Sequence, residues 1–133
     1  MFTDANKKLK REGEMDSEAV KANEKRFFDY LNKRDTEAMK KWIDEFVAED
    51  FVNHSPVLGV PTDREGLKEM FLKMFQFFPD MTIKIEEMVF ENEILCFRHI
   101  IQGLGTPDGI MGIAMVRFKG GRMTERWVTT DAK

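Results

Sequence analysis

Apolar residues in the first third of the chain recur at the spacing of α-helices. Residues 17–32 carry one apolar stripe, which ends at the polar residues 33–35. Residues 36–47 carry a second stripe at positions i, i+3, i+4, i+7 and i+8, and Asp35 stands where a helix N-cap is expected. The pattern predicts two helices, and the other face of the second is charged and solvated.

A third helix is predicted over residues 65–78, where Leu, Met and Phe repeat the helical spacing for three turns. Thr62 and Glu65 form the T-x-x-E pattern of a capping box before it, and Pro79 ends it. Residues 48–61, between the second and third helices, hold two prolines and a glycine. This composition indicates a short extended piece followed by a loop.

After Pro79 the apolar period changes from that of a helix to that of a strand. Met81, Ile83 and Ile85 share one face, but the apolar face then continues on the even positions Met88 and Phe90. A β-bulge at residues 86 and 87 would explain this change of parity and would kink the strand.

Three more strands are predicted over residues 94–102, 110–118 and 122–130. The loop between the first two contains glycines and a proline, and the paired glycines Gly120 and Gly121 suit a tight hairpin between the last two. A run of helices followed by a run of strands is typical of an α+β domain. We therefore predict three N-terminal helices packed on a strongly curved antiparallel sheet, which together form a cone with an apolar interior.

The expected domain covers residues 17–133, because residues 1–16 are charged and carry almost no apolar periodicity. These first residues are expected to be a frayed helix or a tail. They contain no apolar stretch like that of a secretory signal, and no run in the chain approaches the ~20 apolar residues of a membrane span. We expect a cytoplasmic protein that does not enter a membrane.

The charge balance of the chain argues against nucleic acid as a partner. The chain has 133 residues and a net charge of -3, from 24 acidic and 21 basic residues, so a broad basic surface for nucleic acid is not expected. The single cysteine, Cys96, cannot form an intrachain disulfide and lies in an apolar run, where a buried and unreactive thiol is the usual outcome.

Four segments carry a family resemblance: AEDFVNHSP, REGLKEMFLKMFQFFPDMTIKIEEMVF, RHIIQG and RFKGGRMTERWVTTD. Their order and spacing resemble the SnoaL-like polyketide cyclase family of the NTF2-like superfamily, which has a cystatin-like cone. The resemblance implies a pocket for a small hydrophobic molecule and acid/base cyclisation or isomerisation of a polyketide- or steroid-like carbonyl compound. It implies no cofactor, and a homodimer formed through the outer face of the sheet.

The resemblance also suggests catalytic residues. Asp131 matches the acid that ends the family pattern E-x-W-x-x-x-D, where it is proposed as general acid/base, and His54 matches the histidine of the segment before the third helix. A carboxylate inside an apolar pocket has its pKa raised by desolvation and can move protons near neutral pH. The alternatives are a solvated carboxylate near the C-terminus and a structural histidine.

His99 is the third candidate. Alternation puts it on one face of its strand and Arg98 on the other, but does not say which face lines the pocket. The resemblance favours His99 inside and Arg98 outside. His54, His99 and Asp131 would then converge on one apolar cavity, as in many small-ligand sites. Their spacing matches no metal motif, so no metal is predicted.

Four aromatic residues, Trp127, Phe28, Phe51 and Phe71, are candidates for the pocket wall, although core packing is the alternative for each. The alternative for the whole protein is a non-catalytic ligand-binding or dimerisation domain, because one fold can carry many functions. Gly103, Leu104 and Gly105 stand where the family often has Gly-Thr-His, which favours this alternative.

Overall fold

A computed structural model describes residues 10–11 and 14–131. Its helices are α2 (Ser17–Asn32), α3 (Thr36–Phe46) and α4 (Arg64–Phe77), and its main strands are β3 (Val47–Asn53), β4 (Thr82–Glu91), β5 (Ile94–Gln102), β6 (Ile110–Lys119) and β7 (Arg122–Thr130). The three predicted helices are confirmed. In the predicted tail, β1 (Lys10–Arg11) and β2 (Glu14–Met15) pair antiparallel, and residues 1–9 and 12–13 lie outside the described residues.

Aspartates cap the helices. Asp35 caps α3 as predicted, because its side chain accepts a hydrogen bond from the Ala38 amide. The predicted Thr62 cap of α4 is wrong by one residue, since Asp63 accepts from the Gly66 amide at 2.8 Å. The extended backbone of Asp63 aims its carboxylate at the first turn of the helix.

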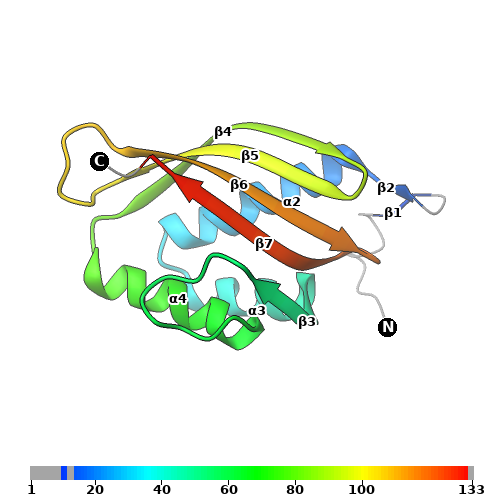
Figure 1. Cartoon of the computed structure of the whole chain (residues 1–133), viewed down its shortest axis with the longest axis horizontal. Coiled ribbons are helices and arrows are strands. Elements are labelled where there is room, and N and C mark those ends of the chain that lie inside the picture. The colour runs from blue at the N-terminus through cyan, green and yellow to red at the C-terminus, as the bar shows by residue number, and fades with distance from the viewer. Residues whose placement is uncertain (1–9, 12–13, 132–133) are drawn as a thin grey trace.

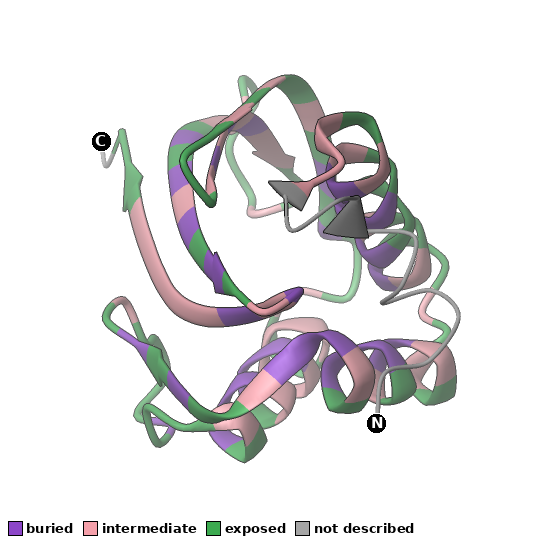
Figure 2. Cartoon of the chain, turned by 90° about the vertical axis from the view of Figure 1, so that its right-hand side faces the viewer, coloured by how far each residue is buried: buried purple, intermediate pink, exposed green. Residues whose placement is uncertain are grey.

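The main sheet has the strand order β3-β7-β6-β5-β4 and curves around the helices (Figures 1 and 2). The strands β4 to β7 form the predicted antiparallel meander, and the register shift between Ile85 and Glu87 confirms the predicted bulge. The short strand β3 pairs with β7 in parallel, which the sequence pattern did not predict.

Each strand of the meander has an inner face, toward the helices, and an outer face. On β5 the inner side chains Leu95, Phe97 and His99 are buried, whereas the outer side chain of Arg98 is partly exposed. The predicted orientation of His99 and Arg98 is therefore confirmed. Among the helices of the described residues, none combines the length and apolar character needed to cross a membrane.

Candidate functional site

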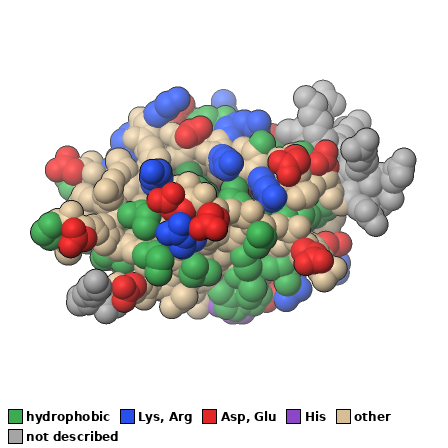
Figure 3. Space-filling model, turned by 90° about the horizontal axis from the view of Figure 1, so that it is seen from above, with side chains coloured by type: hydrophobic (Ala, Val, Ile, Leu, Met, Phe, Trp, Pro, Cys, Tyr) green, Lys and Arg blue, Asp and Glu red, His purple; other side chains and the backbone are tan. Residues whose placement is uncertain are grey.

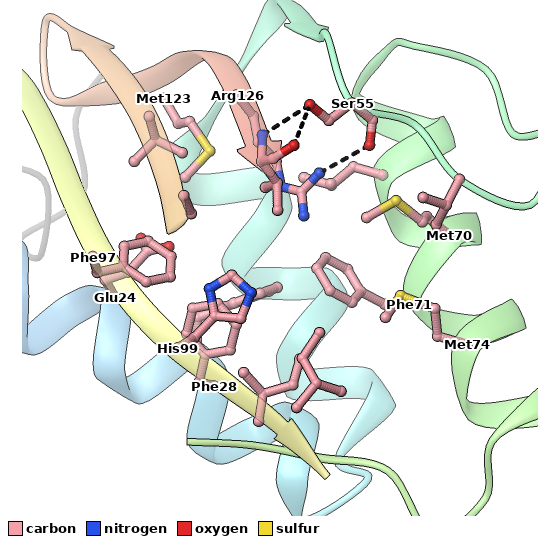
Figure 4. A pocket seen from close by; sticks show the side chains of 18 of the residues that line it. Glu24, Phe28, Ser55, Met70, Phe71, Met74, Phe97, His99, Met123 and Arg126 are labelled. Carbon is pink, nitrogen blue, oxygen red and sulfur yellow. Dashed lines mark hydrogen bonds between the residues drawn. The ribbon is translucent and has the colours of Figure 1, made fainter. Parts of the chain in front are cut away.

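The inner face of the sheet and the helices enclose a cavity of about 440 Å³. Its wall is mainly apolar and includes the aromatic and thioether side chains of Phe28, Phe71, Phe97, Met70 and Met74 (Figure 4). The rings pack edge to face, with 5.5 Å between the centroids of Phe28 and Phe97. Phe28 and Phe71 thus lie on the wall, as the sequence analysis expected.

Glu24 brings a carboxyl group from α2 to this apolar wall. Its side chain is 3% exposed, and Oε1 has no hydrogen-bond partner among the described residues. Burial raises the pKa of Glu24 to about 8, although the positive charge of Arg126 opposes the rise. At neutral pH the carboxyl group is therefore mostly protonated.

His99 brings an imidazole to the cavity from β5. It is 5% exposed, and its Nδ1 has no hydrogen-bond partner among the described residues. Burial, aided by the charge of Arg126, lowers the pKa of His99 to about 4, so the ring is neutral at pH 7. The ring fits because its neighbour on β6 is Gly112, where a Cβ would lie 2.5 Å from Nε2 of His99.

Arg126 brings a guanidinium group to the cavity from β7. Its Nη1 donates to Oδ1 of the fully buried Asn53 at 3.1 Å and to the carbonyl oxygen of Ser55 at 3.4 Å. Burial lowers the pKa of Arg126 to about 10, against the effect of Glu24, so the group stays charged at neutral pH. Figure 4 shows its guanidinium group and the ring of His99 pointing into the cavity from different strands.

The structure does not bring His54 and Asp131 to His99, so the expected convergence is wrong. His54 is exposed, its Nε2 lies 2.9 Å from Oε2 of Glu125, and its ring stacks on Trp127 at 4.8 Å between centroids. Asp131 is exposed just after the end of β7, and its amide donates to the carbonyl of Met111.

Strand alternation explains both this result and the position of Trp127. Arg126 and Val128 face the cavity from β7, so Trp127 between them lies on the outer face. The expected pocket roles of Trp127 and Phe51 are not met, because neither residue lines the cavity. Phe51 is buried on β3 and belongs to the core cluster instead.

The sequence analysis missed Glu24 and Arg126, the two charged residues of the cavity. A signal for Glu24 exists, because it lies four residues after Val20 and three before Phe27, within the apolar stripe of α2. Arg126 shares the parity of the apolar residue Val128, which would have placed it inside once the inner face was known. In the described part of the chain, no cluster of His, Cys, Asp or Glu suits a metal ion.

A comparison with protein-family models identifies the family of the chain. Residues 25–126 match the model of the SnoaL-like domain. IdmH, a candidate polyketide cyclase from Streptomyces antibioticus, is 25% identical, and the two structures superimpose with a TM-score of 0.65 over 84% of this chain and 91% of that chain. A comparison with functionally curated proteins finds no match.

Two further solved structures share the fold. A candidate polyketide cyclase from Bacillus cereus has a TM-score of 0.67 and 22% identity over 82% of this chain and 72% of that chain. A candidate isomerase of the SnoaL-like family from Agrobacterium tumefaciens has a TM-score of 0.70 and 16% identity over 84% of this chain and 96% of that chain.

Proposed function

We propose that this chain, which belongs to the SnoaL-like domain family, binds a small hydrophobic carbonyl compound of polyketide- or steroid-like character and isomerises or cyclises it by acid/base chemistry. One observation carries the proposal: a buried carboxyl group, that of Glu24, has an oxygen with no partner among the described residues and lines an apolar cavity. Such a group is costly for folding, which favours a use in chemistry.

The chemistry divides between two side chains. Glu24 has a pKa of about 8, so the minor fraction that is ionised at neutral pH can take a proton from a carbon next to the carbonyl and return it elsewhere. His99 is neutral, and a ring N–H can donate a hydrogen bond to the oxygen on which negative charge develops. The apolar wall excludes water and strengthens both interactions.

The family resemblance assigns the proton transfer to Asp131, but we assign it to Glu24. Asp131 is exposed to solvent and does not line the cavity. Glu24 and His99 both line the cavity, so a substrate held there can reach both.

The experiment compares Glu24→Gln with Asp131→Asn in a screen of hydrophobic ketones for conversion. We expect Glu24→Gln to lower kcat by about 10² to 10⁴ while the ligand still binds, and Asp131→Asn to leave kcat unchanged. Turnover of Glu24→Gln at the wild-type rate would contradict the assignment. Binding without conversion by the wild-type protein would favour the alternative, a ligand-binding domain.

We also propose that the protein forms a homodimer through the outer face of the sheet. Strand register aligns one row of uncharged side chains across this face: Val89, Cys96, Met115 and Trp127. Val89 is 66% exposed, and Ile113, in the next row, is 43% exposed. Large apolar residues exposed together on one face are typical of an interface.

Charges on the same face suit a second copy as the partner. Arg98 pairs with Glu87 at 2.8 Å and Arg117 with Glu125 at 3.1 Å, so both signs lie beside the apolar row. Figure 3 shows hydrophobic side chains gathered around neighbouring acidic and basic ones on the upper side of the molecule. A surface with both signs can complement itself across a two-fold axis.

Sedimentation velocity tests the dimer. Ile113→Glu puts a charge in the apolar face and should give monomers, whereas Phe77→Glu, at an exposed site on α4, should leave the dimer intact. A wild-type protein that sediments as a monomer at all concentrations would contradict the dimer.

A further inference from the structure

We infer that the ligand of this cavity carries a carboxylate on its apolar body, and that the carboxylate binds the guanidinium group of Arg126. The inference rests on the proposed function, because it names the substrate class of the same cavity: an apolar keto acid in place of a neutral ketone.

The hydrogen-bond partners of Arg126 support a carboxylate ligand. Its described hydrogen bonds go to neutral oxygens, those of Asn53 and Ser55, and both are made by Nη1. The guanidinium group is a planar fork of five donors that matches a carboxylate with two parallel hydrogen bonds. Burial of a cation among neutral groups costs desolvation free energy that no ion pair offsets. An anionic ligand should therefore bind strongly beside Arg126.

The net charge of the cavity also supports a carboxylate ligand. Glu24 on α2 is mostly protonated and His99 on β5 is neutral at pH 7, while Arg126 on β7 is charged. The walls contributed by α3, α4, β4 and β6 carry no titratable side chain, and neither does the loop after β3. One positive charge is left in an apolar space, which favours one negative charge in the ligand.

The acid at Glu24 makes the pairing dependent on pH. Ionised Glu24 places a second negative charge in the same cavity and satisfies Arg126 through space, as its coulombic effect on the pKa of Arg126 indicates. A bound carboxylate and an ionised Glu24 therefore compete for one cation. Since the pKa of Glu24 is about 8, the affinity for a carboxylate should fall as the pH rises through this value.

Isothermal titration calorimetry with two probes of one shape tests the inference: 4-phenylbutanoate and its methyl ketone analogue, 5-phenyl-2-pentanone. At pH 7 we expect the carboxylate to bind at least ~10-fold more tightly than the ketone. Arg126→Gln should remove this preference, so that the two probes bind the variant with equal affinity. Equal affinity of the wild-type protein for the two probes, or no binding of either at millimolar concentration, would overturn the inference.

The wild-type protein supplies a second measurement, because Arg126→Gln also loses bonds to β3 and the following loop. Between pH 7 and pH 9 the affinity for 4-phenylbutanoate should fall about 10-fold, while that for the ketone stays constant. Glu24→Gln should abolish the fall, and a carboxylate affinity that does not change with pH in the wild-type protein would overturn the inference.

The two proposals fail in different ways. If the carboxylate is preferred through Arg126 but Glu24→Gln turns over substrate at the wild-type rate, the inference holds and the proposed proton transfer is wrong. If only neutral ketones bind and Glu24→Gln abolishes their conversion, the proposed function holds and the inference is wrong.

Discussion

The two histidines of this protein lie on opposite faces of one sheet and show how much the surroundings decide their chemistry. His99 faces inward, has an unpartnered Nδ1 among the described residues and has a pKa lowered to about 4. His54 lies against the outer face, is partly exposed, and contacts both a carboxylate and an indole ring. The family pattern pointed to His54, but it is the buried ring of His99 whose surroundings suit a role in the cavity.

Two arginines, Arg126 and Arg98, show the same contrast between the inner and outer faces of the sheet. Arg126 is inside, held by the neutral oxygens of Asn53 and Ser55, whereas Arg98 is outside and forms an ion pair with Glu87. Because Arg126 is desolvated, loss of one of its hydrogen bonds costs more free energy. Water screens the exposed ion pair of Arg98 and Glu87. The inner face therefore holds its polar groups in an apolar environment, whereas those of the outer face contact solvent.

Removal of the partner of each arginine should give the largest difference between the two faces. Asn53→Ala takes away the side chain that accepts from Arg126 and also from the Ser55 amide at 3.0 Å. We expect it to lower the free energy of unfolding by about 3 kcal/mol, since a buried charge loses the shorter of its two described hydrogen bonds. Urea denaturation followed by circular dichroism measures this value.

The matched change on the outer face is Glu87→Ala, which removes the partner of Arg98. It should cost about 0.5 kcal/mol, because the pair is exposed and the freed guanidinium is solvated. Equal costs for Asn53→Ala and Glu87→Ala would contradict the distinction between the two faces.

The stability of the protein should depend on pH through Glu24. The pKa of Glu24 rises from 4.5 to about 8 on folding, so the folded state holds this proton more tightly than the unfolded state. The stabilisation is complete below about pH 4.5 and is lost as the pH rises toward 8. His99 has a lowered pKa and acts in the opposite direction, but only below about pH 6.5.

The window from pH 6.5 to pH 8 therefore isolates Glu24. Across it the unfolding free energy of the wild-type protein should fall by about 1.6 kcal/mol more than that of Glu24→Gln. Asp131→Asn, which changes an exposed carboxylate, serves as the control and should follow the wild-type curve. Parallel curves for Glu24→Gln and the wild-type protein would show that Glu24 does not hold its proton near neutral pH.

Local patterns predicted most of the fold, and long-range contacts explain what they missed. The helices and the bulge at residues 85–87 follow from spacing that a few neighbouring residues record, and the predicted NTF2-like α+β fold is confirmed. The parallel pairing of Val52 with Glu125 joins distant segments and leaves no local signal. Glutamate side chains are mostly exposed, but the position of Glu24 within the apolar stripe of α2 buries it.

The smallest expected effect concerns Gly112, which makes room for the inner histidine. A Cβ at this position would lie 2.5 Å from Nε2 and 2.7 Å from Cε1 of His99, atoms at the far end of a side chain that can move. Gly112→Ala should therefore cost only about 1 kcal/mol in unfolding free energy and should displace the ring. Chemical shifts of the His99 ring, followed by NMR, report the displacement.

A double-mutant cycle shows whether the cost comes from this contact. In a His99→Ala background only the approach of the Cβ to the Thr129 carbonyl oxygen at 3.0 Å remains, so Gly112→Ala should cost less there, and the coupling energy should reach about 1 kcal/mol. Thr129→Ile, which adds bulk to an exposed position of the neighbouring strand β7, should be nearly neutral in both backgrounds. If Gly112→Ala costs the same with and without the His99 ring, its effect arises from the β6 backbone, and the inner histidine does not depend on the missing side chain.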